Sequence, residues 1–294
     1  MIRAPLHGTG GLSAVTRVFA VLGDPVSHSL SPIFQNAALR AEGLDAVYVA
    51  LRCSRAAAPT VVDALARAGG GGNVTLPHKQ VVLRAIEAPT AAVDRTGACN
   101  TFWLEAGRVC GDNTDVAGFR AATQALIGNT AGSRALLLGA GGAARAAACA
   151  LLDDGIARID VLNRTRDRAE DLRARLDHGD QRIRVAESIE VAAGERFDLV
   201  INATSLGLRD ADPHPVDLSR LAHVGAAIDL VYRPGGTAWS EHAAALGIAA
   251  ADGLEMLLYQ GAAAFERWWG RAAPLDAMRQ ALTAATPRVS ADRA

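Results

Sequence analysis

The chain contains a single lysine, Lys79, and arginine supplies the other 29 of its 30 Lys and Arg residues. Lys79 lies in the stretch NVTLPHKQ, directly after an apolar run that ends at Pro77. A lysine amine can exchange a proton near neutral pH, whereas a guanidinium, with a pKa above about 12, cannot. Proton transfer is therefore one interpretation of Lys79, and an ordinary solvated surface charge is the other.

Three further polar segments accompany Lys79 at the expected ends of strands or in loops, where ligand-binding groups of α/β proteins collect. They are His28-Ser29-Leu30-Ser31-Pro32, Asn100-Thr101 and Gly111-Asp112-Asn113-Thr114-Asp115. Taken singly, each has a structural explanation, because Ser31 with Pro32 is a good helix start and the acidic segment fits a polar turn. Together, and ahead of a nucleotide motif, they are hard to attribute to chance.

A glycine-rich segment that follows fits a dinucleotide-binding turn. Gly139-Ala140-Gly141-Gly142-Ala143-Ala144 matches G-x-G-x-x-A between an expected strand, 134–139, and an Ala-rich helix that ends at Gly155. Gly139 permits the tight turn, Gly141 lets backbone approach a pyrophosphate, and the helix N-terminus presents N–H donors to the anion. A purely structural glycine turn is the alternative, but strand, turn and helix together favour cofactor binding.

The end of the next expected strand, 158–164, indicates which dinucleotide binds. An NAD site usually places Asp or Glu there to accept from the ribose 2′-OH. This chain has Asn163-Arg164-Thr165 instead, with Arg168 one helical turn further on. Two guanidiniums without a carboxylate favour a 2′-phosphate, so the sequence predicts NADP(H) rather than NAD(H).

The elements that must position these residues alternate between apolar runs and helical stretches, which predicts an α/β fold. From Ser133 a doubly wound domain is expected, with strands at 134–139, 158–164, 182–188, 197–205, 225–232 and 246–253 and helices at 139–155 and 166–177. The first part has no glycine signature and is expected to be a partner domain, with apolar runs at 18–25, 46–53, 71–77 and 100–111 and helices at 32–42 and 57–69.

After Gly253 the pattern returns to helix, and the spacing of Met256, Leu257, Gln260 and Phe265 predicts that this helix packs back on the first domain. We therefore expect an N-terminal α/β substrate-binding catalytic domain over 1–119, completed by C-terminal helices over 253–294. A Rossmann-type NADP-binding domain is expected over 120–252.

Composition argues against several other functions. The net charge of -1 and pI near 6.7, without a run of arginines, argue against a nucleic-acid partner. No apolar stretch approaches the ~20 residues of a membrane span, and the N-terminal segment lacks the apolar region of a secretory signal, so a cytoplasmic protein is expected. The four cysteines match neither a CxxC pair nor a zinc site, so no metal is expected.

Nine motifs follow one another from near the N-terminus to the C-terminal helix. They are SHSLSP (27–32), GNVTLPHK (72–79), GACNT (97–101), GDNTD (111–115), GAGGAAR (139–145), NRT (163–165), INATSLG (201–207), DLVY (229–232) and GLEMLLYQG (253–261). In this order they resemble the shikimate dehydrogenase family over nearly the whole chain. Such collinearity is far more specific than any single motif.

The resemblance implies an NADP-dependent reduction of 3-dehydroshikimate to shikimate, in aromatic amino acid biosynthesis, by a monomer or homodimer. Lys79 and Asp115 resemble the catalytic pair, and Ser29 and Ser31 resemble the hydroxyls that hold the substrate carboxylate. The residues that match family positions binding ring hydroxyls or the reacting oxygen are Asn73, Thr75, Asn100 and Gln260. The residues that match positions lining the nicotinamide and substrate side of the cleft are Tyr232 and Gly253. The chemistry agrees, because hydride transfer to a ketone leaves negative charge on oxygen that an ammonium can stabilise and protonate.

Some positions depart from the family pattern. His78 stands where the family often has Phe, and it either packs as an aromatic ring or acts on Lys79. Glu255 and the segment 237–243 also differ. These departures leave open whether shikimate, quinate or an aminoshikimate is the preferred substrate. A binding module without catalysis is the remaining alternative, and the presence of both Lys79 and Asp115 argues against it.

Overall fold

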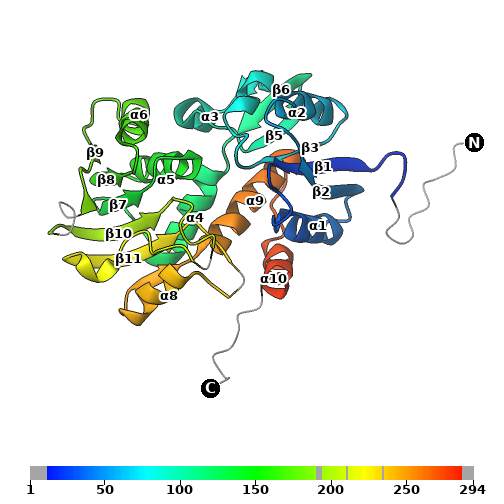
Figure 1. Ribbon diagram of the computed structural model, residues 1–294. Coiled ribbons are helices and arrows are strands. Elements are labelled where there is room, and N and C mark those ends of the chain that lie inside the picture. Colours follow the sequence, from blue (N-terminus) through cyan, green and yellow to red (C-terminus); the bar gives the residue numbers. More distant parts are fainter. Residues whose placement is uncertain (1–11, 190–193, 210, 234, 287–294) are drawn as a thin grey trace, which may run out of the picture.

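The computed structural model describes residues 12–189, 194–209, 211–233 and 235–286. Expectations for the first 11 residues and for 287–294 lie outside this part of the chain. The described residues form two six-stranded sheets, with helices α4 (Asp115–Ile127) and α9 (Gly253–Trp269) side by side between them (Figure 1). The α/β fold class is thereby confirmed.

The first sheet is mixed, in the order β2-β1-β3-β5-β6-β4. Strand β1 pairs in parallel with β2 and β3, whereas β5 is antiparallel to β3 and β6. The strands are β1 Arg17–Gly23, β2 Ala46–Arg52, β3 Gly71–Val74, β4 Ala88–Pro89, β5 Thr101–Glu105 and β6 Arg108–Asp112.

The apolar run at 100–111 is a β-hairpin rather than a single element. Ala106 and Gly107 both have positive φ, 48° and 76°, and they connect β5 to β6 directly. Two successive residues with positive φ form the two-residue turn whose twist suits a hairpin. The turn therefore divides the run into two antiparallel strands.

Helices cover both faces of the first sheet because the side chains of β1 alternate between them. Phe19 and Val21 join the core that lies under α1, α9 and α10, whereas Ala20 and Leu22 join the core under α2. The helical elements around this sheet are α1 Ser31–Ala41, α2 Ala58–Arg67, η1 Val81–Ala85, α3 Ala91–Thr96 and α10 Leu275–Ala285.

The second sheet is entirely parallel, in the order β12-β11-β10-β7-β8-β9. This is the doubly wound order, with its switch point between β7 and β10, where ligands of such sheets bind. The strands are β7 Arg134–Leu138, β8 Arg158–Leu162, β9 Ile183–Val185, β10 Arg196–Asn202, β11 His223–Asp229 and β12 Ala249–Ala251, and the helices are α5 Gly142–Asp153, α6 Arg166–Leu176, η2 Leu218–Arg220 and α8 Ala238–Ala245.

Helix α9 belongs to both cores. Leu258 and Phe265 pack in the first sheet's core, as its apolar spacing predicts, but Met256 packs in the core of the second sheet with residues of α4 and α5. The helix therefore fixes how the two sheets meet.

Candidate active site

Lys79 lies in the short loop that follows β3. The loop is tied to its surroundings by the backbone, because the Thr75 amide donates to the Leu22 carbonyl and the Cys99 amide donates to the Lys79 carbonyl, both at 2.8 Å. The Lys79 side chain is only 17% exposed. This exposure excludes the interpretation of Lys79 as an ordinary solvated surface charge.

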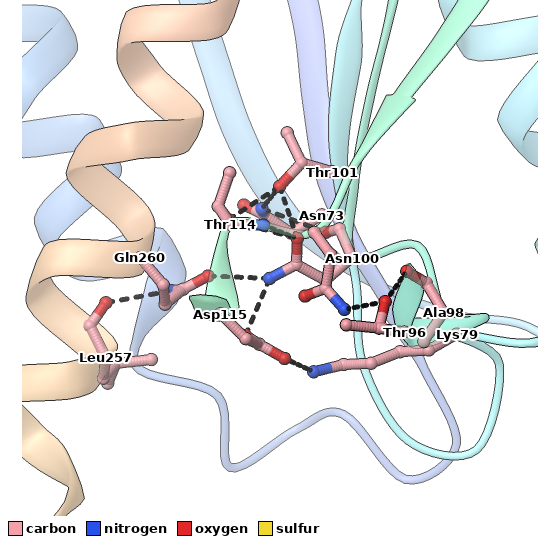
Figure 2. A network of polar contacts seen from close by, with 11 residues as sticks. Asn73, Lys79, Thr96, Ala98, Asn100, Thr101, Thr114, Asp115, Leu257 and Gln260 are labelled. Atoms are coloured by element: carbon pink, nitrogen blue, oxygen red, sulfur yellow. Dashed lines mark hydrogen bonds and ion pairs between the residues drawn. The ribbon is translucent and has the colours of Figure 1, made fainter. Parts of the chain in front are cut away.

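The Lys79 ammonium donates to Asp115, with Nζ 2.5 Å from Oδ2 (Figure 2). Asp115 is the first residue of α4, where the helix dipole favours a negative charge. The second carboxylate oxygen, Oδ1, accepts from Asn100 Nδ2 at 2.7 Å, and the Asp115 side chain is 7% exposed. Asp115 is thus held at both oxygens with its carboxylate against the lysine.

Asn100 is the centre of a buried polar network that Figure 2 shows as one connected cluster. Its Oδ1 accepts from the Thr114 amide at 2.7 Å and from the Thr101 hydroxyl at 2.9 Å, while its Nδ2 also lies 3.4 Å from Gln260 Oε1. Asn73 donates through Nδ2 to the Thr101 hydroxyl at 2.9 Å. The network thus joins β3, the start of β5, the first turn of α4 and α9.

Tyr48 extends this network, and the sequence did not identify it as a candidate site residue. Its hydroxyl donates to Asn73 Oδ1 at 2.7 Å and also contacts the Ser31 side chain. Burial raises the pKa of Tyr48 well above its usual value, so the phenol stays a protonated donor. The sequence carries no signal for it, because Tyr48 is one residue of an ordinary strand pattern.

Thr101 and Thr114, which belong to the polar segments found in the sequence but were assigned no role there, are also members of the network. Both lie inside the quoted motifs GACNT and GDNTD, so their signal was present. Ser31 is buried, whereas Ser29 is half-buried and its hydroxyl accepts from the Ser31 amide at 3.3 Å. Thr75 is half-buried, and its methyl carbon lies only 2.6 Å from where a Cβ on Gly23 would be.

The glycine turn lies directly beside Lys79. Gly139 has a φ of +108°, and a Cβ there would be 2.8 Å from the Ala203 carbonyl, so only glycine fits. A Cβ on Gly141 would meet no atom within 4 Å, and one on Gly142 would lie 3.8 Å from Lys79 Cδ. The turn follows β7 of the second sheet and Lys79 follows β3 of the first, and the two lie side by side.

The residues of the turn fit a dinucleotide. Helix α5 begins at Gly142 without a side-chain cap, so its first N–H groups are available to an anion. After β8, Asn163 Nδ2 donates to the Thr165 carbonyl at 2.7 Å and shapes the loop. Arg164 and Arg168 are exposed, and neither forms an ion pair with any described residue. Their guanidiniums therefore remain available to a phosphate.

Gly253 lies against Leu230 and Val231, the two residues just before Tyr232, at the carboxyl edge of the second sheet. A Cβ on Gly253 would lie 2.5 Å from the Leu230 carbonyl, and the Gly253 amide donates to the Val231 carbonyl at 3.0 Å. Burial raises the pKa of Tyr232, whose hydroxyl contacts the Leu30 backbone at the start of α1. Tyr232 thereby connects the second sheet to the segment that carries Ser29 and Ser31.

His78 is fully buried and packs away from solvent. Its Nε2 lies 2.8 Å from the Cys53 carbonyl, so this nitrogen carries the proton and donates. Nδ1 is buried without a hydrogen-bond partner among the described residues. These contacts favour the packing interpretation over a direct action on Lys79.

The protein has a doubly wound parallel sheet and a second, mixed sheet, and a lysine–carboxylate pair lies beside the glycine turn. These features define a two-domain protein of the dinucleotide-binding class. Three family descriptions match the chain: "Shikimate dehydrogenase substrate binding domain" over 21–102, "Shikimate / quinate 5-dehydrogenase" over 121–208 and "Shikimate 5'-dehydrogenase C-terminal domain" over 253–283. The chain belongs to the shikimate dehydrogenase family.

Individual relatives resemble this chain over most of its length. The shikimate dehydrogenase (NADP(+)) of Brucella ovis is 39% identical over 85% of this chain and 87% of its own. The crystal structure of shikimate dehydrogenase from Aquifex aeolicus superposes with a TM-score of 0.85 at 32% identity, covering 92% of this chain and 99% of that one. The Thermus thermophilus enzyme in complex with NADP(H) and shikimate gives a TM-score of 0.82 at 39% identity, with the same coverage.

Among the described residues, no helix is both long enough and apolar enough to cross a membrane. All four cysteines, Cys53, Cys99, Cys110 and Cys149, are free thiols.

Proposed function

We propose that this protein reduces 3-dehydroshikimate to shikimate with NADPH, and catalyses the reverse oxidation with NADP. The observation that carries the proposal is the Lys79–Asp115 pair, 2.5 Å apart and almost shielded from solvent, beside the glycine turn at Gly142. The Thermus thermophilus enzyme, solved in complex with NADP(H) and shikimate on the same fold, supports it.

When bound at the glycine turn and beside Arg164 and Arg168, NADPH would supply the hydride for the ketone carbon of the substrate. Lys79 Nζ gives its proton to the carbonyl oxygen as negative charge develops there, so that one hydride and one proton complete the alcohol. Asp115 holds the lysine in place through Oδ2. Asn100, by binding Oδ1, fixes the direction in which that carboxylate points.

We assign the substrate's polar groups to the network residues around this pair. Ser29 and Ser31 are proposed to bind the carboxylate, supported by the Tyr48 hydroxyl that contacts Ser31. Asn73, Thr75, Asn100 and Gln260 are proposed to bind ring hydroxyls or the reacting oxygen.

The cofactor is assigned to the turn Gly139–Ala143 and to Asn163, Arg164, Thr165 and Arg168. Tyr232 and Gly253 are proposed to line its nicotinamide end.

The domain division we propose is 1–119 with 253–294 for substrate and 120–252 for cofactor. Two sheets with separate cores support it. We further propose a cytoplasmic enzyme, since four free thiols suit a reducing compartment. The protein is proposed to be a monomer or homodimer, which light scattering would distinguish.

The test is an assay of NADPH oxidation with 3-dehydroshikimate, 3-dehydroquinate and the amino analogue, with NADH as the control cofactor. We expect the highest kcat/KM for 3-dehydroshikimate with NADPH. Absence of turnover on all three substrates would refute the proposed activity. A higher kcat/KM for 3-dehydroquinate would instead favour the quinate alternative, which the description of the region 121–208 also covers.

A further inference from the structure

The short helix α3 ends against side chains of the other sheet. A helix leaves its last carbonyls without partners inside the helix. In α3, the Val93 carbonyl accepts from the Gly97 amide, but the Asp94 and Thr96 carbonyls accept from arginines of the second sheet. Arg175 of α6 donates to Asp94 at 3.1 Å, and Arg145 of α5 reaches Thr96 at 3.5 Å.

Arg145 is the buried member of this contact. It lies in the first turn of α5, directly behind the glycine turn, and its side chain is 10% exposed. One guanidinium nitrogen pairs with Asp171 at 2.5 Å, a second reaches the Thr96 carbonyl, and Nε is buried without a partner among the described residues. A buried donor without a partner costs stability, which offsets part of what the other contacts of Arg145 contribute to folding.

The residues after α3 lead directly into the candidate active site. The Cys99 amide donates to the Lys79 carbonyl at 2.8 Å, and the Asn100 side chain donates to Asp115 at 2.7 Å. The Thr96 hydroxyl accepts from Asn113 Nδ2 at 2.9 Å, two residues before Asp115. A shift of α3 would therefore reach both members of the lysine–carboxylate pair.

We propose that Arg145 is a positioning residue that holds the end of α3, and with it Lys79 and Asn100, at a fixed distance from the glycine turn. The proposal rests on the proposed function. Arg145 acts through α3 rather than on the substrate, so its loss alters turnover more than it alters the binding of NADPH alone.

The variant Arg145→Met tests this. Methionine fills much of the same space without a charge, and the Asp171 carboxylate that loses its partner is 64% exposed, so no uncompensated charge is left buried. We expect Tm unchanged or higher, the Kd for NADPH from fluorescence titration within about threefold, and kcat lower by about tenfold, because displacements near 1 Å cost on the order of 10²-fold in rate. Arg173→Met is the matched control, since Arg173 pairs with Glu170 on its own helix and with no other carboxylate in the described part of the chain, and it should change none of these quantities.

A kcat within twofold of wild type would overturn the proposal, and so would a loss of kcat matched by an equal loss of NADPH affinity. If Arg145→Met does not fold, Arg145→Lys replaces it: one ammonium cannot span both acceptors, so kcat should still fall, and an unchanged kcat would overturn the proposal. Hydrogen exchange separates this proposal from the proposed function. The α3 amides should exchange faster in the variant even if the wild type does not reduce 3-dehydroshikimate. Unchanged exchange would overturn the proposal that Arg145 holds the end of α3.

Discussion

The contact between α4 and α9 at Gly118 makes a sharp prediction about the active site. A Cβ on Gly118 would lie 2.6 Å from Gln260 Cβ and 2.7 Å from Gln260 N. Since the second of these atoms is backbone, a side-chain rotation cannot relieve the overlap. Restoring an ordinary contact of 3.4 Å requires the two helices to separate by about 0.8 Å in Gly118→Ala.

Two energies compete in this variant. Alanine stabilises the interior of a helix by about 0.5 to 1 kcal/mol relative to glycine. Overpacking a core costs about 1 to 3 kcal/mol, so the steric effect wins and Tm falls. The same displacement moves Gln260 relative to Asp115, which lies one turn before Gly118 on α4. We expect kcat/KM to fall by about 10- to 100-fold, because misplacements near 1 Å cost on the order of 10²-fold.

The assay is NADPH-dependent reduction of 3-dehydroshikimate, combined with thermal unfolding. Gly194→Ala is the matched control, since a Cβ there meets no atom within 4 Å and its φ is ordinary. The control should leave both quantities unchanged. Wild-type kcat/KM in Gly118→Ala with a lowered Tm would refute the link between helix spacing and the polar network. Wild-type values of both would refute the close packing itself.

Four further results are expected. Lys79→Arg keeps the charge but is a very poor proton donor, so kcat should fall at least about 10²-fold with an unchanged circular dichroism spectrum, and near-normal turnover would exclude proton transfer by Lys79. Arg164→Ala combined with Arg168→Ala should raise KM for NADP at least about tenfold while leaving KM for NAD unchanged, and an unaltered KM for NADP would show that NADP(H) specificity has another origin. Burial raises the pKa of Cys99 to about 12 and that of Cys149 to about 11, so iodoacetamide at pH 8.5 should leave both unlabelled until the protein is unfolded, as mass spectrometry would detect. Because the unfolded thiol ionises near pH 9.0, the free energy of unfolding should decrease as pH rises above 9.0 towards 12.

The second sheet was predictable because its strands are buried on both faces. Such strands appear in sequence as continuous apolar runs, and Gly139 needs both a positive φ and a close approach to Ala203. These requirements are local, so the strands and the turn were found within a few residues of their observed bounds. Lys79 was found for a different reason, since its residue type is unique in the chain.

The features that escaped prediction depend on contacts between distant residues. Tyr48 of β2 and Asn73 of β3 lie on either side of β1, so their contact depends on the register of both strands against β1. In that register Phe19 pairs with both Tyr48 and Gly71. The hairpin of β5 and β6 depends on a positive φ at Ala106, and alanine rarely adopts a positive φ, so the sequence does not indicate the turn. The contact of Gly118 with Gln260 brings together residues 142 positions apart in sequence, which no local pattern encodes.

The packing of α9 has a consequence for synthesis of the chain on the ribosome. The core that holds Phe19 and Phe34 also requires Phe265 and Met278, so the sheet that is translated first is completed last. About 140 residues separate β6 from α9, and translation at about 5 to 20 residues per second takes roughly 7 to 30 seconds to cover them. During that interval the face of β1 that carries Phe19 has no α9 to cover it. Exposed apolar surface of this kind makes a nascent chain prone to aggregate, although the finished protein buries these side chains completely.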